Sequence, residues 1–224
     1  MKLPSRFALA AFVFAGLCAS SPAQNSAPKA AITKDQIVDI KDIKVAVQKT
    51  PDIAMRGTTT DKRWTPKDWL EIEPEFRMPR SPADKKAEVV PEVTIKYYVY
   101  LNSATGVKEN AKILTAEVVH SNVPLEEWTH SVVYISPSTI LRVTGKPQGN
   151  ASLVTAYAVE ITKGGELVGF FSKFGGSSMT SPNANNAKWW ELPSAPAQEP
   201  GLLSKNQSPF APLWGDYHAD VKPK

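Results

Sequence analysis

The residues of this sequence best suited to chemistry include three histidines, His120, His130 and His218. They are far apart in the chain, and none has a second histidine or a cysteine at the short spacing of metal-ligand motifs. A zinc site would therefore need carboxylates from distant segments. We interpret all three histidines as surface or loop residues, and we predict no metal site.

A second candidate is the stretch "WLEIEPEF", residues 69–76, in which Glu71, Glu73 and Glu75 alternate with apolar residues. Alternation with period two indicates a strand, and its charged face is usually solvated. Carboxylate pairs that cleave glycosides lie about 5–10 Å apart and come from separate elements. We therefore expect a solvated face here. A hydrolase with a site scattered over loops stays an alternative, which two close carboxylates in one pocket would favour.

The other familiar catalytic motifs are missing. "FGGSSM", residues 174–179, lacks the closing glycine of a G-x-S-x-G nucleophile elbow. Neither a P-loop nor a G-x-G-x-x-G dinucleotide motif occurs. The sequence therefore predicts a protein that is not an enzyme and that needs no cofactor.

The N-terminus has the layout of a secretory signal peptide. Lys2 and Arg6 precede an apolar run, residues 7–19, and Ser21 and Ala23 suit a small-x-small cleavage site. A run of thirteen is shorter than the about 20 apolar residues that span a bilayer. We expect cleavage of residues 1–23, no transmembrane span in the mature chain, and a location in the periplasm, at the outer membrane or on the cell surface.

The leader favours neither a lipoprotein nor a type IV pilin. Cys18 follows Leu17 rather than a small residue, and no acidic residue occurs before Asp35. Cleavage would remove Cys18, the one cysteine, so no disulfide could stabilise the mature chain. Losing two of the 26 basic residues with the leader lowers the formal net charge from +4 to +2. A net charge this close to zero does not indicate a nucleic-acid-binding protein.

The middle of the chain is a series of short strand patterns. Residues 92–102, 112–123 and 152–161 alternate apolar and polar side chains. Residues 39–50 alternate with a phase shift that indicates a bulge, and Gly164-Gly165 joins two apolar runs as a hairpin. We also expect two strands in residues 131–145, broken at Pro137, and an edge or bulged position at Pro74.

Seven or eight short strands without long helical patterns predict an all-β, immunoglobulin-like β-sandwich held together without disulfides. We place this domain at residues 36–178, after an N-terminal arm at 24–35. A sandwich with open edges often self-associates, so a homo-oligomer stays open.

The last segment, residues 179–224, combines seven prolines with many large apolar side chains. Fully burying one such side chain contributes roughly 1.5–3 kcal/mol. We expect an extended strap that packs on the sandwich, although a docking segment for a partner protein is an alternative. Residues that could contact a partner or ligand are Tyr98, Tyr100, Trp189, Trp190, Phe210, Trp214 and Tyr217. Tyr98 and Tyr100 would be covered by the strap or would form a patch for sugar rings.

The chain resembles a family of small exported, pilus-like proteins encoded beside type IV pilus genes in Gram-negative gut bacteria. The resemblance rests on the stretches at 62–76, 93–102, 165–171 and 202–220. It implies an immunoglobulin-like sandwich, a periplasmic or surface location and no active site.

The sequence therefore predicts a non-catalytic structural or interaction protein associated with type IV pilus assembly or surface adhesion. Its expected partners are envelope or pilus-assembly proteins. The alternative is a carbohydrate-binding or adhesive module that uses exposed Trp and Tyr rings.

Overall fold

The computed structural model describes residues 37–52, 65–82, 85–103 and 111–223. The predicted signal peptide at 1–23 and N-terminal arm at 24–35 lie outside the described residues. Among the residues described, no helix is long and apolar enough to cross a membrane.

One sheet contains the strands β1 (Asp39–Lys49), β2 (Asp68–Arg77), β5 (Trp128–His130), β6 (Val133–Ile135) and β11 (Leu203–Ser204). Its order is β1–β2–β6–β11, and β5 also pairs with β2. All of these pairings are antiparallel. We call it the first sheet.

The second sheet contains β3 (Val89–Leu101), β4 (Lys112–Pro124), β7 (Val154–Lys163), β8 (Glu166–Phe174), β9 (Ser177–Met179) and β10 (Gln198–Pro200). Its order is β10–β4–β3–β7–β8–β9. Only the β10–β4 pairing is parallel among those described.

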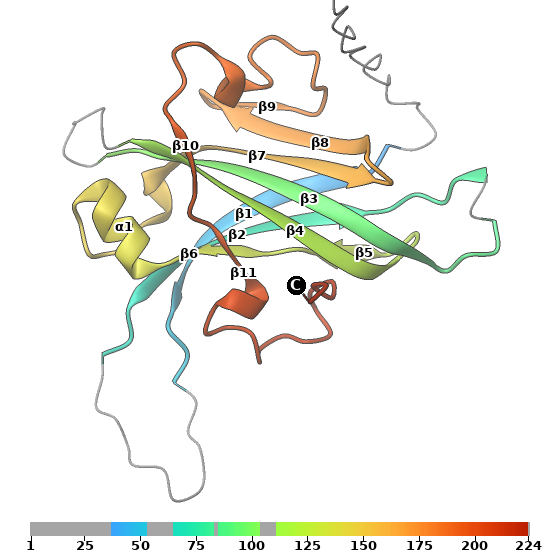
Figure 1. Ribbon diagram of the computed structural model, residues 1–224, viewed down its shortest axis with the longest axis horizontal. Helices are drawn as coiled ribbons and strands as arrows, with labels where there is room; N and C mark the ends of the chain where they lie inside the picture. Colours follow the sequence, from blue (N-terminus) through green and yellow to red (C-terminus); the bar gives the residue numbers. More distant parts are fainter. Residues whose placement is uncertain (1–36, 53–64, 83–84, 104–110, 224) are drawn as a thin grey trace, which may run out of the picture.

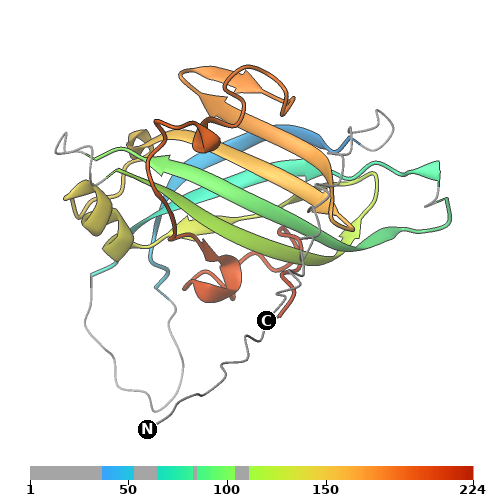
Figure 2. The ribbon, with the colours of Figure 1, turned by 45° about the horizontal axis from the view of Figure 1, so that its top comes forward.

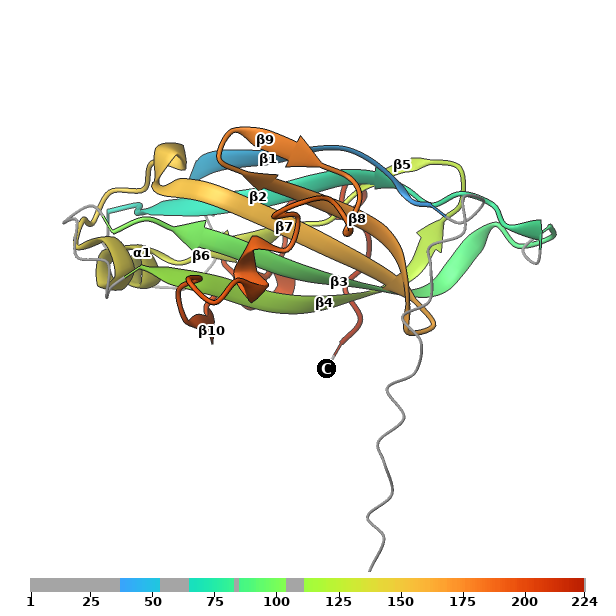
Figure 3. The same ribbon diagram turned by 90° about the horizontal axis from the view of Figure 1, so that it is seen from above.

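The two sheets face each other as the layers of a sandwich (Figures 1 and 3). The expected all-β, disulfide-free, immunoglobulin-like sandwich with a C-terminal strap is confirmed. The described residues contain eleven strands rather than seven or eight, because the strap adds β10 and β11 and the predicted runs leave out the short strands β5 and β9.

The core follows directly from the alternation of β3 and β2. Val93, Ile95, Tyr97, Val99 and Leu101 of β3 are fully buried. They belong to one cluster with three buried residues of β2, which are Leu70, Ile72 and Phe76. Because side chains alternate across a strand, a single register places all the apolar residues between the sheets.

Pro74 departs from expectation, because β2 is an interior strand with neighbours on both sides. The carbonyl of Pro74 accepts a hydrogen bond from the amide of Ser131, which lies between β5 and β6. The missing N–H of Pro74 therefore faces the break between these two strands. A proline is tolerated there because the pairing is already interrupted.

The second strand predicted within 131–145 is wrong, since Pro137–Thr144 form helix α1. The side chain of Ser136 caps the first turn by accepting from the amide of Thr139, and proline suits the first helical position. Gly145 ends the helix with φ of 72°. The capping signals outweighed a short alternating pattern.

Two local predictions are confirmed. The register of β1 against β2 shifts between Ile40 and Asp42, which is the expected bulge. Gly164 and Gly165 join β7 to β8 with φ of +59° and +84°, values that favour glycine in a two-residue hairpin turn.

The C-terminal strap, residues 179–223, runs from the second sheet to the first (Figures 1 and 2). A short 3₁₀ turn, Trp189–Glu191, comes first, and β10 then pairs with β4 at the edge of the second sheet. The chain next crosses to β6, where β11 extends the first sheet. The strap therefore ties together the two sheets along one side of the sandwich.

Candidate functional site

Four of the seven candidate contact residues form one aromatic cluster on the outer face of the second sheet. Trp190 stacks on Tyr98 with ring centroids 4.2 Å apart and an interplanar angle of 13°. Trp189 lies 6.4 Å from Tyr100, measured between ring centroids. Both tryptophans are 3% exposed. We call Trp189 and Trp190 the tryptophan anchor, and their rings cover the two tyrosines.

Two polar contacts to Glu160 support the tryptophan anchor. Lys188 Nζ lies 2.5 Å from Glu160 Oε1, and the hydroxyl of Tyr98 donates to the other carboxylate oxygen. Burial and the negative charge of Glu160 raise the pKa of Tyr98, which keeps its hydroxyl protonated. These rings are therefore used to hold the strap and leave little surface for a ligand.

Phe210 is also buried, on the outer side of the first sheet. Its ring stacks on Tyr134 at 4.4 Å and meets Trp69 edge-on at 5.8 Å. Trp214 and Tyr217 differ from the other candidates, since they are 44% and 49% exposed. Of the candidate contact residues, these two present the most open ring surface.

The structure corrects the interpretation of the three histidines as surface or loop residues. His120 and His218 are buried, and His130 is half-buried. His218 Nε2 lies 3.2 Å from Glu73 Oε2, and His130 Nδ1 lies 3.5 Å from Glu73 Oε1. All three histidines surround the place where residues 217–221 dock.

The expected solvated glutamate face is wrong for Glu71 and Glu73, whereas Glu75 is half-buried and pairs with the exposed Lys41. Glu71 and Glu73 are 3% and 8% exposed, because the strap covers this part of β2. Tyr217 donates to Glu73 Oε1 at 3.3 Å, and its ring stacks on His130 at 4.1 Å. We call Tyr217 and His218, with their partners Glu73 and His130, the histidine anchor.

Glu73 stays ionised in this setting. Burial opposes its ionisation, but the hydrogen bond and charge of His218, together with His130 and Lys44, lower the pKa of its carboxyl. A general acid for glycoside cleavage needs a raised pKa instead. Glu71 and Glu73 do line one pocket, of about 250 Å³, yet they sit side by side on a single strand. The two carboxylates therefore do not favour a hydrolase.

A buried serine–histidine pair lies nearby. His120 Nε2 is 2.6 Å from Ser131 Oγ, which also accepts from the hydroxyl of Tyr97 at 2.5 Å. His120 Nδ1 points to the carbonyls of Ala219 and Asp220, each at 3.2 Å. Burial lowers the pKa of His120 to about 4, against the effect of these carbonyls.

The distance between Ser131 Oγ and His120 Nε2 is typical of a nucleophile and its base. Ser131 is fully buried, however, and lines neither of the two described cavities. A substrate could not reach its hydroxyl in this structure. The pair instead joins β4, the segment after β5 and the end of the strap. Within the described part of the chain, no group of three or more His, Cys, Asp or Glu is placed to hold a metal ion.

Sequence reasoning missed these clusters because their members are far apart along the chain. Tyr217 and His218 reach Glu73 across 144 and 145 residues. The one signal was the presence of histidine and tyrosine in a proline-rich tail. That signal does not say which strand they contact.

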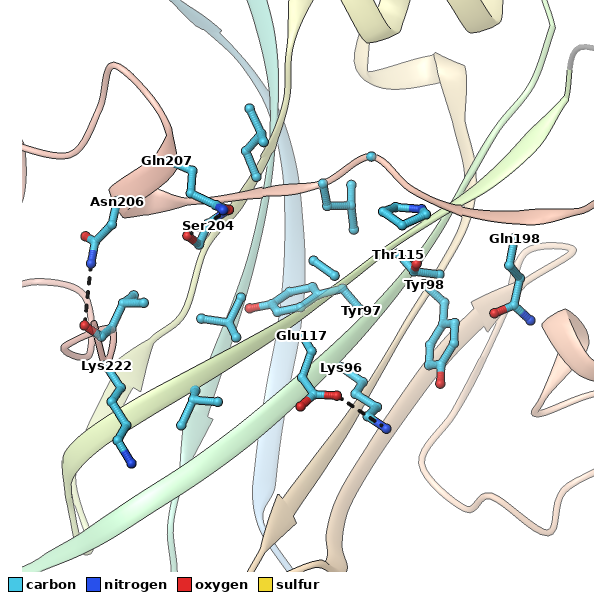
Figure 4. A pocket seen from close by; sticks show the side chains of 18 of the residues that line it. Lys96, Tyr97, Tyr98, Thr115, Glu117, Gln198, Ser204, Asn206, Gln207 and Lys222 are labelled. Carbon is cyan, nitrogen blue, oxygen red and sulfur yellow. Dashed lines mark hydrogen bonds and ion pairs between the residues drawn. The ribbon is translucent and has the colours of Figure 1, made fainter. Parts of the chain in front are cut away.

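A groove of about 950 Å³ lies between β4 and the strap (Figure 4). Its walls are mostly apolar and include Tyr97, Ala116 and Val118 on one side and Leu202 and Leu203 on the other. Lys96 and Glu117 form an ion pair of 3.4 Å at its mouth. A volume of this size is typical of ligand-binding pockets.

The groove exposes a short open edge of β4. On the N-terminal side of this open edge, the carbonyl of Thr115 accepts a hydrogen bond from the amide of Gly201. On its C-terminal side, the carbonyl of Val119 accepts one from the amide of Lys222. Backbone groups of alternate residues point to the same edge, so the N–H and C=O of Glu117 face the groove. No described residue provides a backbone partner for them. The strap thus closes this edge on both sides of Glu117 but not at Glu117.

Comparison with known proteins gives a family and a fold. A crystal structure of a protein from Akkermansia muciniphila matches with a TM-score of 0.69 and 24% sequence identity. The match covers 84% of this chain and 94% of that one, and at this identity it shows the fold alone. No curated protein sequence matches. One protein-family model matches residues 29–224, almost the full length, and the chain belongs to the family that this model represents.

Proposed function

We propose that this protein is an exported, non-catalytic interaction protein of the cell envelope that associates with type IV pilus assembly or surface adhesion. The observation that carries the proposal is the open edge of β4 at Glu117, inside a mostly apolar groove. Exposed strand edges bind extended peptide segments through main-chain hydrogen bonds, and neighbouring pockets select their side chains.

Two further features support a binding role rather than catalysis. The groups that could do acid–base chemistry, Glu73 and His218, bind each other and fix the strap. The buried pair of His120 and Ser131 likewise joins the strap to the sheets. Export is supported by the signal-peptide pattern of residues 1–23.

The partner segment expected in the groove is extended and apolar. It would pair with the backbone of Glu117 and place alternate side chains against Ala116, Val118 and Leu202. Only a short segment fits, because the strap already pairs with β4 at Thr115 and Val119. A loop or chain end of an envelope protein meets this requirement, as does a segment of a second copy.

The test is site-specific photocrosslinking in living cells. A photoreactive residue replaces Glu117, and a control variant carries it at Glu166, which is exposed in the β7–β8 hairpin away from the groove. We expect Glu117 to yield adducts with envelope or pilus-assembly proteins identified by mass spectrometry, and Glu166 to yield none. Equal adducts at both positions, or none at Glu117, would contradict the proposal.

A further inference from the structure

A second cavity lies on the outer face of the first sheet, away from the β4 groove. It has a volume of about 250 Å³, and strands β1 and β2 form its floor while the strap forms its wall. This volume is below the 300–1,000 Å³ of drug-sized sites, so it would hold one small ring rather than a chain of rings.

Two partly exposed aromatic residues, Trp214 and Tyr217, line this cavity, and His218 meets both rings edge-on. Trp214 stacks on Phe210 at 6.2 Å, and Tyr217 stacks on His130 at 4.1 Å. Each ring is therefore covered on one side by another ring, yet nearly half of each residue is exposed. Such rings offer flat apolar surfaces to a ligand that enters the cavity.

Trp214 adopts a backbone conformation that is unfavourable for a residue with a bulky side chain. Its φ is 54°, a left-handed value that is rare for a bulky residue. The buried ammonium of Lys205 donates to the carbonyl of Trp214 at 3.0 Å and fixes this conformation. Strained residues that the surroundings hold in place gather at binding sites, and here the strain presents an indole at the rim.

The polar lining is mixed in charge. Glu71 and Glu73 carry carboxylates, and Lys44 carries an ammonium group. Gln48 Nε2 donates to Glu71 Oε1 at 3.0 Å, which leaves the second N–H of this amide for a ligand. His218 also lines the cavity, and its buried Nδ1 has no hydrogen-bond partner among the described residues. Buried polar atoms are normally paired, so this nitrogen is free to bond with a ligand.

These features select one class of ligand. Two carboxylates disfavour an anion, and Lys44 together with His218, whose charge acts on Glu73, offsets their negative charge and weakens the attraction of a simple cation. A neutral sugar ring has an apolar face for the indole and hydroxyls that both donate and accept. We infer that the cavity bounded by Trp214, Tyr217, Glu71 and Glu73 binds a single neutral sugar residue.

This site would make the protein a carbohydrate-binding module in addition to the proposed partner-binding role. It moves the expected sugar contact from Tyr98 and Tyr100, which the tryptophan anchor covers, to the first sheet. It does not depend on the β4 groove. Crosslinking at Glu117 and sugar binding at Trp214 can therefore succeed or fail separately.

The test is saturation-transfer NMR with galactose, N-acetylglucosamine and fucose on the full mature chain. We expect transfer to the C–H protons of at least one sugar in the wild type and binding weakened at least tenfold in Trp214→Ala. Trp128→Ala is the matched control, because Trp128 is 45% exposed but lies outside the cavity. It should bind as the wild type does.

Lys44→Met provides a second variant that replaces no residue of the strap, since Lys44 lies on β1, and at pH 7 Glu73 stays ionised through its hydrogen bond to His218. It should also weaken binding, while the circular dichroism and melting temperature stay unaltered. Absence of transfer to all three sugars would overturn the inference. Undiminished binding in Trp214→Ala or in Lys44→Met would overturn it too, as would tighter binding of choline or acetate than of any sugar.

Discussion

The C-terminal strap is fixed to its two sheets by different chemistry. On the second sheet, Trp190 of the tryptophan anchor stacks on Tyr98, and both tryptophans of the anchor are 3% exposed. On the first sheet, the histidine anchor uses Glu73, His218 and Tyr217. Apolar stacking depends little on pH, whereas contacts between a carboxylate and histidines change with protonation.

This difference indicates that the two ends of the strap open under different conditions. The tryptophan anchor should remain closed until the domain unfolds. The histidine anchor should open locally when its groups change charge, which would widen the β4 groove bounded by residues 221–223. The end of the strap beside the groove is therefore the part that responds to its environment.

The largest effect is expected for Trp190→Ala. Removal of a buried tryptophan side chain leaves a cavity over Tyr98 and Phe170 and should destabilise the fold by about 3–5 kcal/mol. Denaturant unfolding monitored by circular dichroism measures this loss. Trp128→Ala is the control, because Trp128 is exposed and lies against Lys41 and Arg77 in cation–π geometry, so it should cost less than about 1 kcal/mol. Equal losses of unfolding free energy in the two variants would contradict the prediction that Trp190 anchors the strap and Trp128 does not.

The second effect is a loss of stability in acid through His120. Its pKa is about 4 in the folded protein and about 6.5 when unfolded, so the unfolded chain binds more protons between these values. Stability should therefore be complete above pH 6.5 and fall by about 3 kcal/mol as the pH drops to 4. Below pH 4 both states carry the proton, and this contribution levels off.

Urea unfolding at pH 7.0 and pH 4.5 measures the effect of His120. The variant His120→Gln should be less stable at pH 7.0 but should lose less stability on acidification than the wild type. Glu73 adds a loss in the same direction below its ordinary pKa, because its folded pKa is lowered. An identical pH dependence in wild type and His120→Gln would show that His120 is not the group responsible.

A smaller effect is expected for Glu73→Gln, which keeps the size of the side chain but removes its charge. The contacts to His218 and Tyr217 weaken, and the cost should be about 1–3 kcal/mol. Hydrogen exchange should accelerate at the amides of Ala219 and Lys222, which bond to the sheets. Exchange at Glu191 and Leu192, beside the tryptophan anchor, should stay unchanged.

Asp39→Asn serves as the control for Glu73→Gln. Asp39 pairs with Arg77 on the surface, where an ion pair contributes about 0–1 kcal/mol. Faster exchange along the whole strap in Glu73→Gln would mean that the two anchors open together. That result would contradict the comparison between them.

The local elements could be read from the sequence where the pattern was long and regular. The alternation of residues 92–102 predicted β3, and two glycines predicted the β7–β8 turn. The prediction failed at α1, where a short stretch satisfies both a strand pattern and helix-capping rules. Short segments are ambiguous because few residues define the period.

The candidate site was less predictable. The tail aromatics were recognised as contact residues, but the sequence could not separate buried rings such as Phe210 from open ones such as Trp214. The glutamates of β2 were assigned to solvent because their own strand shows only alternation. Their burial depends on a segment more than 140 residues further along the chain.

The sequence by itself determined the class of fold, since alternating side chains and the shortage of cysteine leave a sandwich with an apolar interior. It also determined that the tail must pack somewhere, because many large apolar side chains would be costly in water. Tertiary structure alone decided which face each part of the tail covers. The reason is that long-range pairing fixes which partners meet, and a local pattern carries no information about a partner so distant in the chain.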